Sequence, residues 1–270
     1  DVPKEAKTKR GDVYRLGEHV LMCGDSTSEA DFDKLFSIGG GADKVEMIFT
    51  DPPYGGSYSD KNRYLNAVAP AHRIQVPIEN DSKPPEEMYG FWKKAFELAR
   101  KYLADYSAYY VTAPQGGDLL MMMMMMKDAG LPLRHCLVWV KNNHVLGRSD
   151  YNYKHEPILY GWVNHHRFYA KGAFKFSTWE IPKPLKSDLH PTMKPVALIK
   201  NAILNSAAED SYVLDMFGGS GSTLIACEET GRKCRMMELS PEYCDVIVER
   251  WEKLTGKHAE LIREGGKDAN

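Results

Sequence analysis

The stretch "YVLDMFGGSGSTLIACEETGRKCRMMEL", residues 212–239, carries the pattern that decides the fold. A short apolar run ends at Asp215, a glycine-rich turn follows, and a second β-rich run ends at Glu238. Residues 222–230 between them have the composition of a helix, so the stretch predicts a strand, a helix and another strand. Such a unit is typical of an α/β domain with a mostly parallel sheet.

The same alternation of β-rich and helical runs continues through most of the chain. It predicts strands at residues 19–22, 45–50, 108–112, 134–141, 156–162, 212–215 and 233–238. It predicts helices at residues 86–103, 118–128, 195–207, 222–230 and 241–254. The fold class expected is therefore α/β, with a doubly wound, Rossmann-like sheet.

The glycine turn predicts a pocket for a nucleoside cofactor. Glycines let the backbone approach a ligand, and the N–H groups that open the next helix favour an anionic group. A carboxylate that closes the next strand, here Glu238, can accept hydrogen bonds from two ribose hydroxyls. A nicotinamide dinucleotide would call for a third glycine where Leu224 stands, and the chain has no phosphate-binding G-x-x-x-x-G-K-[ST] motif. An adenosine with an amino-acid carboxylate and no phosphate fits better, which describes S-adenosyl-L-methionine.

A second stretch, "VEMIFTDPPYGGSYSD" at residues 45–60, ends a predicted strand in Asp51, Pro52, Pro53 and Tyr54. An exocyclic amine of a nucleobase is a poor nucleophile, and hydrogen bonds from it to a carboxylate and a proline carbonyl would improve it. Prolines suit this task because they have no N–H to compete for the acceptors. Ligands gather at the carboxyl ends of parallel strands, so we expect these residues to face the glycine turn. The competing interpretation is a simple strand-ending turn.

Positive charge and aromatic rings are concentrated in residues 134–194. This segment holds ten Lys or Arg against four Asp or Glu, whereas the whole chain has a net charge of −2. Basic residues neutralise phosphates and rings stack on bases, so the segment predicts a nucleic-acid groove, with a solvated basic face as the alternative. The candidate nucleic-acid contacts are Tyr58, Lys141, Arg148, Lys154, Arg167, Lys171 and Lys175.

Composition excludes several other classes of protein. No apolar run approaches the roughly 20 residues that cross a bilayer, and the N-terminal residues are charged. We therefore expect a cytoplasmic protein of a bacterial or phage-infected cell that has no membrane partner. The five cysteines are scattered without a C-x-x-C pair, so no metal site is predicted.

Three motifs in this order resemble a known family. "DPPY", then "HPTMKP" at residues 190–195, then "DMFGGSGST" are similar to those of the β-class S-adenosylmethionine-dependent DNA amino-methyltransferases, which include phage and bacterial modification methylases. The resemblance runs from about Gly11 to Leu261. It implies a seven-stranded sheet with one antiparallel strand, which we assign to residues 156–162.

The resemblance also implies a role for individual residues. Asp51, Pro52, Pro53 and Tyr54 would be catalytic, Asp25 would meet the adenine of the cofactor, and Glu238 its ribose. The cofactor-binding residues implied are Asp25, Asp51, Thr192, Lys194, Asp215, Phe217, Gly218, Gly219, Ser220, Gly221, Ser222, Thr223 and Glu238. Within this set, residues 217–221 would hold the methionine moiety, and Thr192 and Lys194 would lie beside its carboxylate.

The same resemblance sets expectations for domains and substrate. Residues 1–10 are interpreted as a linker or tag remnant and residues 11–270 as the methyltransferase domain, with a mobile loop at 55–85 and a target-recognition insertion at 164–189. The first residues are similar to those of methylases that follow a ParB-like domain, which would then be missing from this chain; a homodimer is left open. The expected substrate is adenine N6 in DNA, in a nucleotide flipped out of the duplex. Cytosine N4 is the alternative, and a non-catalytic nucleic-acid-binding subunit is a further one.

Overall fold

The sheet contains ten strands within the residues that the structure describes. The structure is a computed structural model and describes residues 3, 5–38, 44–55, 84–142, 150–172, 174–183 and 193–262. The strands are β1 (Val13–Leu16), β2 (His19–Cys23), β3 (Val45–Thr50), β4 (Leu103–Thr112), β5 (His135–Val140), β6 (His155–Trp162), β7 (Thr178–Glu180), β8 (Tyr212–Asp215), β9 (Lys233–Glu238) and β10 (Glu260–Ile262). Their order is β10-β1-β2-β9-β8-β3-β4-β6-β5-β7.

The centre of this sheet confirms the predicted one. The seven strands from β2 to β5 in that order are the seven predicted, and among them only β6 runs antiparallel to its neighbours. The sequence did not predict the edge strands β1, β7 and β10, nor that β1 runs antiparallel to both β2 and β10. Runs of three or four residues are too short to show a periodic pattern.

Six helices accompany these strands in the described residues. They are α1 (Glu29–Ser37), α3 (Pro85–Arg100), α4 (Gly117–Asp128), α5 (Val196–Ser206), α6 (Ser222–Thr230) and α7 (Pro241–Thr255). All except α1 were predicted, although α3 ends at Arg100 and Leu103 already belongs to β4. The missed helix has a local signal, because the Ser28 side chain accepts a hydrogen bond from the Asp31 N–H as an N-cap.

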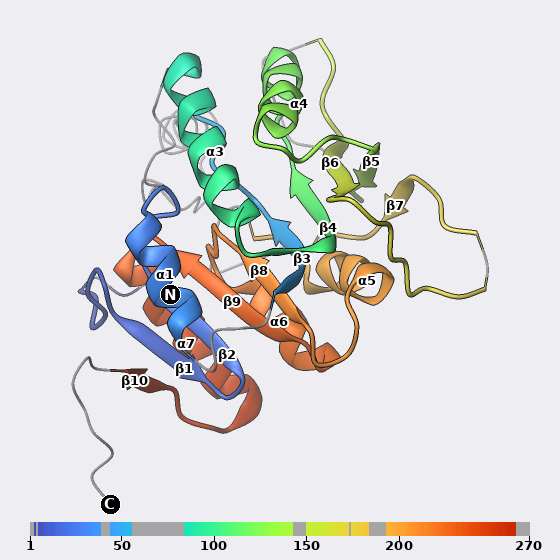
Figure 1. The fold of residues 1–270 in the computed structure, drawn as a ribbon. Coiled ribbons are helices and arrows are strands. Elements are labelled where there is room, and N and C mark those ends of the chain that lie inside the picture. Colours follow the sequence, from blue (N-terminus) through green and yellow to red (C-terminus); the bar gives the residue numbers. More distant parts are fainter. Residues whose placement is uncertain are drawn as a thin grey trace, which may run out of the picture.

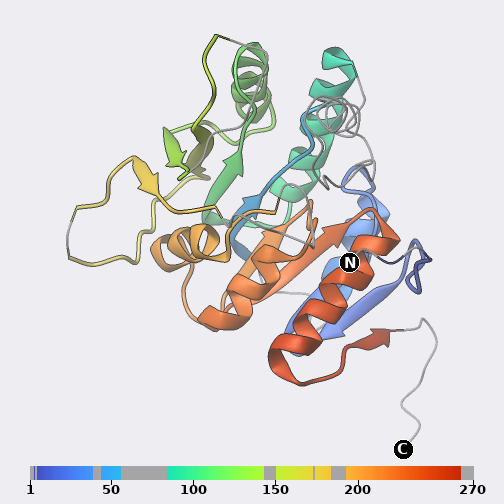
Figure 2. The ribbon, with the colours of Figure 1, turned by 180° about the vertical axis from the view of Figure 1, so that it is seen from behind.

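The helices cover both faces of the sheet and form three layers. Helices α1, α3 and α4 lie on the face seen in Figure 1, and α5, α6 and α7 lie on the face seen in Figure 2. Each face has its own apolar cluster, because successive side chains of a strand point to opposite sides. On β3, for example, Met47 and Phe49 join the α5–α6 side while Ile48 joins the α3 side.

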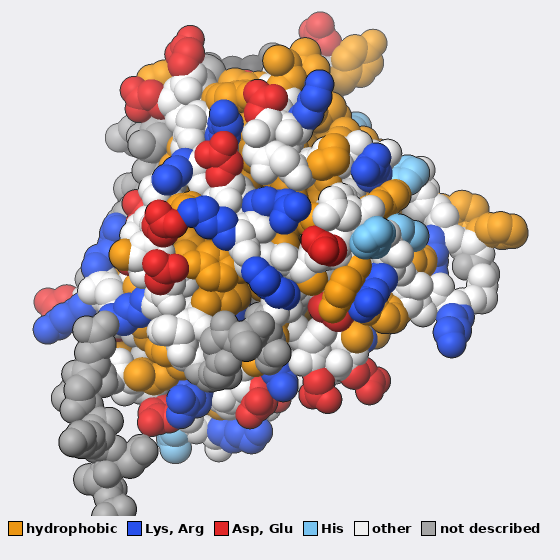
Figure 3. All heavy atoms as spheres, viewed as in Figure 1, with side chains coloured by type: hydrophobic (Ala, Val, Ile, Leu, Met, Phe, Trp, Pro, Cys, Tyr) orange, Lys and Arg blue, Asp and Glu red, His pale blue; other side chains and the backbone are white. Residues whose placement is uncertain are grey.

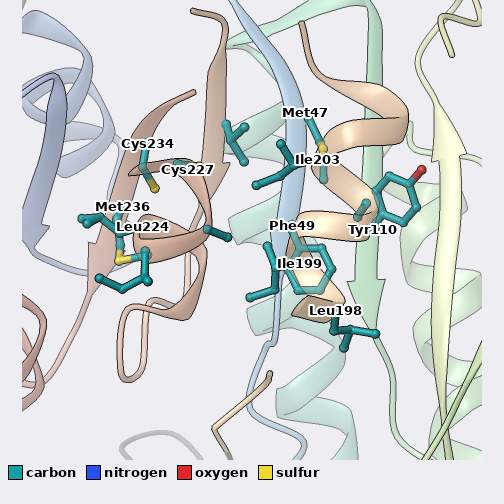
Figure 4. Packing of buried hydrophobic residues seen from close by; sticks show 14 of the residues in the cluster. Met47, Phe49, Tyr110, Leu198, Ile199, Ile203, Leu224, Cys227, Cys234 and Met236 are labelled. Carbon is teal, nitrogen blue, oxygen red and sulfur yellow. The ribbon is translucent and has the colours of Figure 1, made fainter. Parts of the chain in front are cut away.

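Figure 4 shows the first of these clusters, where α5 and α6 pack on the sheet. Ile199 and Ile203 of α5 lie against Phe49 of β3, and Leu224 of α6 lies near Met236 of β9. All five side chains are at most 1% exposed. At roughly 1.5–3 kcal/mol for each fully buried apolar side chain, this packing fixes both helices against the strands that end at Asp51 and Asp215.

The N-terminal segment packs on the same domain. Residues 1–10 were predicted as a linker or tag remnant, but Thr8 is buried and its hydroxyl donates to the Asp245 carboxylate of α7 at 2.5 Å. The backbone N–H groups of Lys7 and Thr8 donate to the same carboxylate. Most of the loop predicted at 55–85 lies outside the described residues.

The strand order reverses between β3 and β8, which are parallel neighbours. From β3 the chain crosses through α3 to β4 on one side, and from β8 it crosses through α6 to β9 on the other. The two crossings leave in opposite directions, so a crevice opens where the carboxyl ends of β3 and β8 meet. This switch point therefore places Asp51 beside the glycine turn.

Charges of both signs are mixed on the face of α1, α3 and α4. In Figure 3, Lys and Arg side chains are interspersed with Asp and Glu over these helices, and His side chains gather toward the β5–β7 edge. A search of the described helices finds none with the length and apolar content to span a membrane.

We predict that Gly161→Ala destabilises the fold, because a methyl group there would come within 2.5 Å of the Tyr109 hydroxyl and 2.7 Å of the Pro132 carbonyl. We expect a loss of about 1–3 kcal/mol in the free energy of unfolding, measured by urea denaturation. The matched control is Gly90→Ala in α3, where the added methyl meets nothing within 4 Å. It should stabilise the protein by about 0.5–1 kcal/mol; equal effects of the two substitutions would contradict the packing described.

Candidate active site

The carboxyl ends of β3 and β8 are joined by a buried hydrogen bond. Thr50, the last residue of β3, donates its hydroxyl proton to Oδ1 of Asp215 at 2.7 Å, and Asp51 follows directly. The Asp215 carboxylate also accepts from the Thr223 hydroxyl of α6 at 2.6 Å and from the Phe217 N–H at 3.1 Å. One carboxylate thus ties the strand that carries Asp51 to the glycine turn and to the helix that follows.

Asp51 is held by groups from three other parts of the chain. Its Oδ2 accepts from Lys194 Nζ at 2.6 Å, just before α5. Its Oδ1 accepts from the hydroxyl of Thr112 at the end of β4. The Tyr54 hydroxyl lies 3.0 Å from both Asp51 Oδ1 and the Thr112 hydroxyl. The carboxylate is therefore oriented in advance, while about a quarter of its side chain stays exposed.

The two proline carbonyls of the DPPY turn are not equivalent. Trp92 of α3 donates its indole N–H to the Pro53 carbonyl at 2.8 Å and is itself fully buried. No donor among the described residues reaches the carbonyl of Pro52. A substrate amine therefore has the Pro52 carbonyl, beside the Asp51 carboxylate, as its open acceptor.

Lys194 also connects Asp51 to a second carboxylate. Its Nζ lies 3.4 Å from Oε2 of Glu156 on β6, and Oε1 of Glu156 lies 3.1 Å from Lys141 Nζ. Burial alone would raise the pKa of Glu156, but the charges of Lys194 and Lys141 outweigh it and lower that pKa to about 2. Burial would lower the pKa of Lys194, but Asp51 and Glu156 outweigh it and raise that pKa. Both groups are therefore charged near neutral pH.

The glycine turn is fitted closely against β9. A Cβ on Gly218 would come within 2.8 Å of Met236, and Gly221 has a φ of +79° where α6 begins. The Gly219 N–H donates to Oε2 of Glu238 at 2.7 Å, and the Ser240 N–H donates to Oε1 at 2.8 Å. These bonds leave the Glu238 carboxylate further lone pairs with which to accept from a ligand.

Several polar side chains of the predicted cofactor set bind the protein itself. The Ser220 carbonyl and the Ser222 hydroxyl accept from Arg250 of α7 at 2.9 and 3.2 Å, and Thr223 binds Asp215. Phe217 lies with its ring centroid 5.8 Å from that of Phe91 in α3. We infer that Ser220, Ser222, Thr223 and Asp215 shape the turn, and that the backbone of the turn remains to face a ligand.

Four predicted residues follow one another along the carboxyl edge of adjacent strands. Asp25 comes just after β2, Glu238 ends β9, the glycine turn leaves β8, and Asp51 leaves β3. Cys23 pairs with Glu238, and the Gly24 N–H donates to the Glu238 carbonyl at 3.0 Å, so Asp25 lies next to the end of β9. The edge therefore presents a carboxylate, a second carboxylate, a close-fitting turn and a third carboxylate in that order.

Residues 45–249 match the N6_N4_Mtase family, described as DNA methylase. The chain belongs to this family. The type II methyltransferase M2.LlaDCHI of Lactococcus lactis subsp. cremoris is 26% identical to the methylase, over 78% of this chain and 83% of that protein. DNA adenine methyltransferase YhdJ of Escherichia coli (strain K12) is also 26% identical, over 82% of this chain and 81% of that protein.

Solved structures support the same fold. The complex of M1.HpyAVI with SAM has a TM-score of 0.59 and 20% identity, and the match covers 85% of the methylase and 97% of that chain. PvuII DNA methyltransferase, described as cytosine-N4-specific, has a TM-score of 0.64 and 16% identity, covering 93% and 94% of the two chains. The predicted Rossmann-like fold and the predicted family are thus confirmed.

The cofactor of the methylase is S-adenosyl-L-methionine. The residues present fit it, because the order of groups along the sheet edge is the order of its parts from adenine through ribose to methionine. Glu238 has lone pairs for the ribose hydroxyls, and the glycine turn lies where a Cβ would collide with Met236. Among the described residues, no three His, Cys, Asp or Glu side chains form a group that could hold a metal ion.

The structure divides the predicted nucleic-acid contacts. Lys154, Lys171 and Lys175 are exposed. Lys141 does not fit this role, because its side chain is 2% exposed and is paired with Glu156. Tyr58, Arg148 and Thr192, the last from the cofactor set, lie outside the described residues.

Arg167 also does not fit the role at the crevice. Its guanidinium lies 3.3 Å from the ring centroid of Tyr106, near the start of β4, and 3.9 Å from Glu46, near the start of β3. This is the amino end of those strands, opposite Asp51. Because β6 is antiparallel, the chain after Trp162 leaves the sheet at that end, so the first part of the insertion predicted at 164–189 starts away from the crevice.

Sequence reasoning missed three residues that support the site: Thr112, Trp92 and Glu156. Thr112 and Trp92 lie inside predicted elements and resemble ordinary core residues in the sequence. Glu156 left a weak signal, since it is a charged residue at the start of an otherwise apolar predicted strand.

We predict a pH-dependent stability effect for Asp215→Asn. Burial raises the pKa of Asp215 to about 7, against the opposing hydrogen bonds from Thr223, Thr50 and the Phe217 N–H. Because this folded-state pKa exceeds the unfolded value, the stability that Asp215 contributes is complete at acid pH and is lost as the pH rises through about 7. Between about pH 5 and pH 8, the wild-type free energy of unfolding should fall relative to that of the variant by about 2–4 kcal/mol.

The measurement is urea unfolding across this pH range, with Asp118→Asn, an exposed position at the start of α4, as the control. The control should follow the wild type at every pH. Parallel curves for wild type and Asp215→Asn would show that Asp215 is ionised at low pH in the folded protein.

Proposed function

We propose that the chain transfers a methyl group from S-adenosyl-L-methionine to N6 of adenine in DNA. The observation that carries this proposal is the sequence of groups along the sheet edge, which ends in the Asp51 carboxylate and the open Pro52 carbonyl. Two acceptors at this point suit an NH₂ group, which has two hydrogens to donate. When bound, the cofactor supplies the electrophilic methyl group, and the rest of the chemistry belongs to the protein.

Asp51 and Pro52 are the proposed acceptors for the amine. Hydrogen bonds to both favour a pyramidal nitrogen, so that its lone pair points away from the base and toward the turn at Gly219. The Lys194 ammonium 2.6 Å from Asp51 keeps this carboxylate charged and in place. Because the acceptors are positioned before the substrate arrives, little reorganisation is needed at the transition state.

Proton balance also points to Asp51. The amine forms one N–C bond and must give up one proton, while the bond between the methyl carbon and sulfur breaks. The Asp51 carboxylate lies where the amine hydrogens are held, so we assign it as the first proton acceptor. Proton transfer by a positioned group of this kind typically contributes 10²–10⁴-fold to the rate.

Tyr54 is proposed to stack on the target base. Its hydroxyl lies 3.0 Å from both Asp51 and Thr112, which restricts the ring to one orientation. A base inside a duplex cannot reach this position, so the nucleotide must leave the stack at a cost of a few kcal/mol. The exposed Lys154, Lys171 and Lys175 are proposed to offset part of that cost through phosphate contacts.

Adenine is our first choice of base. The relative named as a DNA adenine methyltransferase is 26% identical over most of the chain, which favours adenine. The cytosine-N4-specific neighbour shares only 16% identity, which bears on the fold alone. Relatives named as type II methyltransferases suggest a modification role in bacteria or their phages, and we propose the cytoplasm as the location.

We predict that Asp51→Ala lowers the rate of methyl transfer to duplex DNA by about 10²–10⁴-fold. The assay follows label from S-adenosyl-L-methionine into DNA, and base-resolved sequencing of the product identifies the modified base. Asp118→Ala, at an exposed position, should match the wild type. Modified cytosine in place of adenine would establish the alternative base, and equal rates for wild type and Asp51→Ala would reject the proposed mechanism.

We also predict that Glu238→Gln weakens cofactor binding. The carboxamide accepts hydrogen bonds at one oxygen instead of two and carries no charge, so the ribose hydroxyls lose a charged partner. Loss of a hydrogen bond to a charged group costs about 1.5–3 kcal/mol, which predicts a rise in Kd of about 10-fold or more by calorimetry. Glu260→Gln on the edge strand β10 is the control; unchanged affinity in Glu238→Gln would place the ribose elsewhere.

A further inference from the structure

Glu156 bridges two buried lysines and touches neither the turn nor the DPPY residues. Its Oε1 lies 3.1 Å from Lys141 Nζ, which is 2% exposed, and its Oε2 lies 3.4 Å from Lys194 Nζ, which is 9% exposed. Each oxygen has its own partner, so the carboxylate has one orientation. That orientation aims the second oxygen toward the lysine that binds Asp51.

The four charges form an alternating chain across four parts of the fold. Lys141 follows β5, Glu156 lies on β6, Lys194 precedes α5, and Asp51 follows β3. The links are 3.1, 3.4 and 2.6 Å long. Lys183, which follows β7, is the other charged group that acts on Lys194 from a neighbouring element.

Burial makes this arrangement consequential. A buried ammonium needs an anion, and without one it is strongly destabilised. If Asp51 were its sole partner, Lys194 would have no other anion when Asp51 turns to a substrate amine. The second carboxylate gives Lys194 a fixed anchor, so that its ammonium stays in place while Asp51 accepts the amine.

We propose that Glu156 is a positioning residue that holds the Lys194 ammonium against the catalytic carboxylate of Asp51. This inference rests on the proposed role of Asp51. Glu156 does not touch the substrate; it acts through Lys194, and its loss affects turnover more than cofactor binding. Lys141 in turn fixes Glu156, so it serves the site from the interior and not the DNA surface.

The test compares single-turnover and steady-state methylation of duplex DNA by variants of the full chain. Glu156→Gln should lower kcat by about 10- to 100-fold, the range found for groups that orient metal ligands from outside the first layer. KM for S-adenosyl-L-methionine should stay within about 2-fold of the wild type. Glu156→Asp, which keeps the charge, should retain most of the turnover.

Further variants separate positioning from damage to the fold. Glu156→Gln leaves Lys141 buried without an anion, so the double variant Lys141→Met with Glu156→Gln removes that burden and should still be slow. Glu180→Gln is the matched control, since Glu180 is an exposed carboxylate on β7. Thermal unfolding of every variant reports whether it is folded.

A double-mutant cycle shows whether Glu156 acts through Lys194. In a Lys194→Met background, Glu156→Gln should have no further effect on kcat, because the group it positions is gone. Multiplying effects of the two substitutions would overturn the proposal, and so would wild-type turnover in both the single Glu156→Gln variant and the double variant with Lys141→Met.

The outcomes distinguish this inference from the proposed function. If Asp51→Ala is inactive and Glu156→Gln turns over like the wild type, only the role of Glu156 is rejected. If Asp51→Ala is as active as the wild type, the proposed function fails first. In that case the same cycle on thermal stability still tests the pairing, since Glu156 and Lys194 should show a coupling that Glu180 and Lys194 lack.

Discussion

The Asp215 carboxylate is the constraint on which the site depends. It accepts from Thr50 at the end of β3, from Thr223 in α6 and from the N–H of Phe217 in the turn. These three partners belong to the two halves of the sheet that diverge at the switch point. Because a buried polar group without a partner costs about 1–3 kcal/mol, the three bonds form together or not at all. They align the strand that delivers Asp51 with the turn that faces the cofactor.

Charge compensation is the second organising feature of the crevice. Asp51 and Glu156 share Lys194, and Lys141 completes the chain from the interior. A buried ion pair adds little to stability compared with an apolar pair of the same size, but breaking one is expensive. The methylase therefore keeps this network for orientation: the carboxylate that receives the amine is charged, fixed and still partly exposed. Trp92 does the same for the backbone by occupying the Pro53 carbonyl and leaving that of Pro52 open.

The nucleic-acid side of the site is built differently. Positive charge is concentrated in residues 134–194 of the sequence, but the fold distributes it among separate places. Lys141 and Lys194 neutralise buried carboxylates, Arg167 stacks on Tyr106 at the amino end of the strands, and Lys154, Lys171 and Lys175 are exposed. A local excess of charge thus includes residues that serve the interior, so exposure has to be known before a lysine is assigned to DNA.

The sequence by itself determined the central sheet, five of the helices, the cofactor turn and the DPPY residues. These features follow from local patterns: apolar runs with a period, glycines where the backbone must turn, and an acid at a strand end. The tertiary structure alone decided that Glu156 and Thr112 serve Asp51, that Trp92 closes one proline carbonyl, and that Lys141 is buried. Those contacts join residues 15 to 143 positions apart, and their formation depends on the packing of whole elements. Side-chain burial and partner choice are set by that packing, because a strand or helix carries no local record of which element will lie against it.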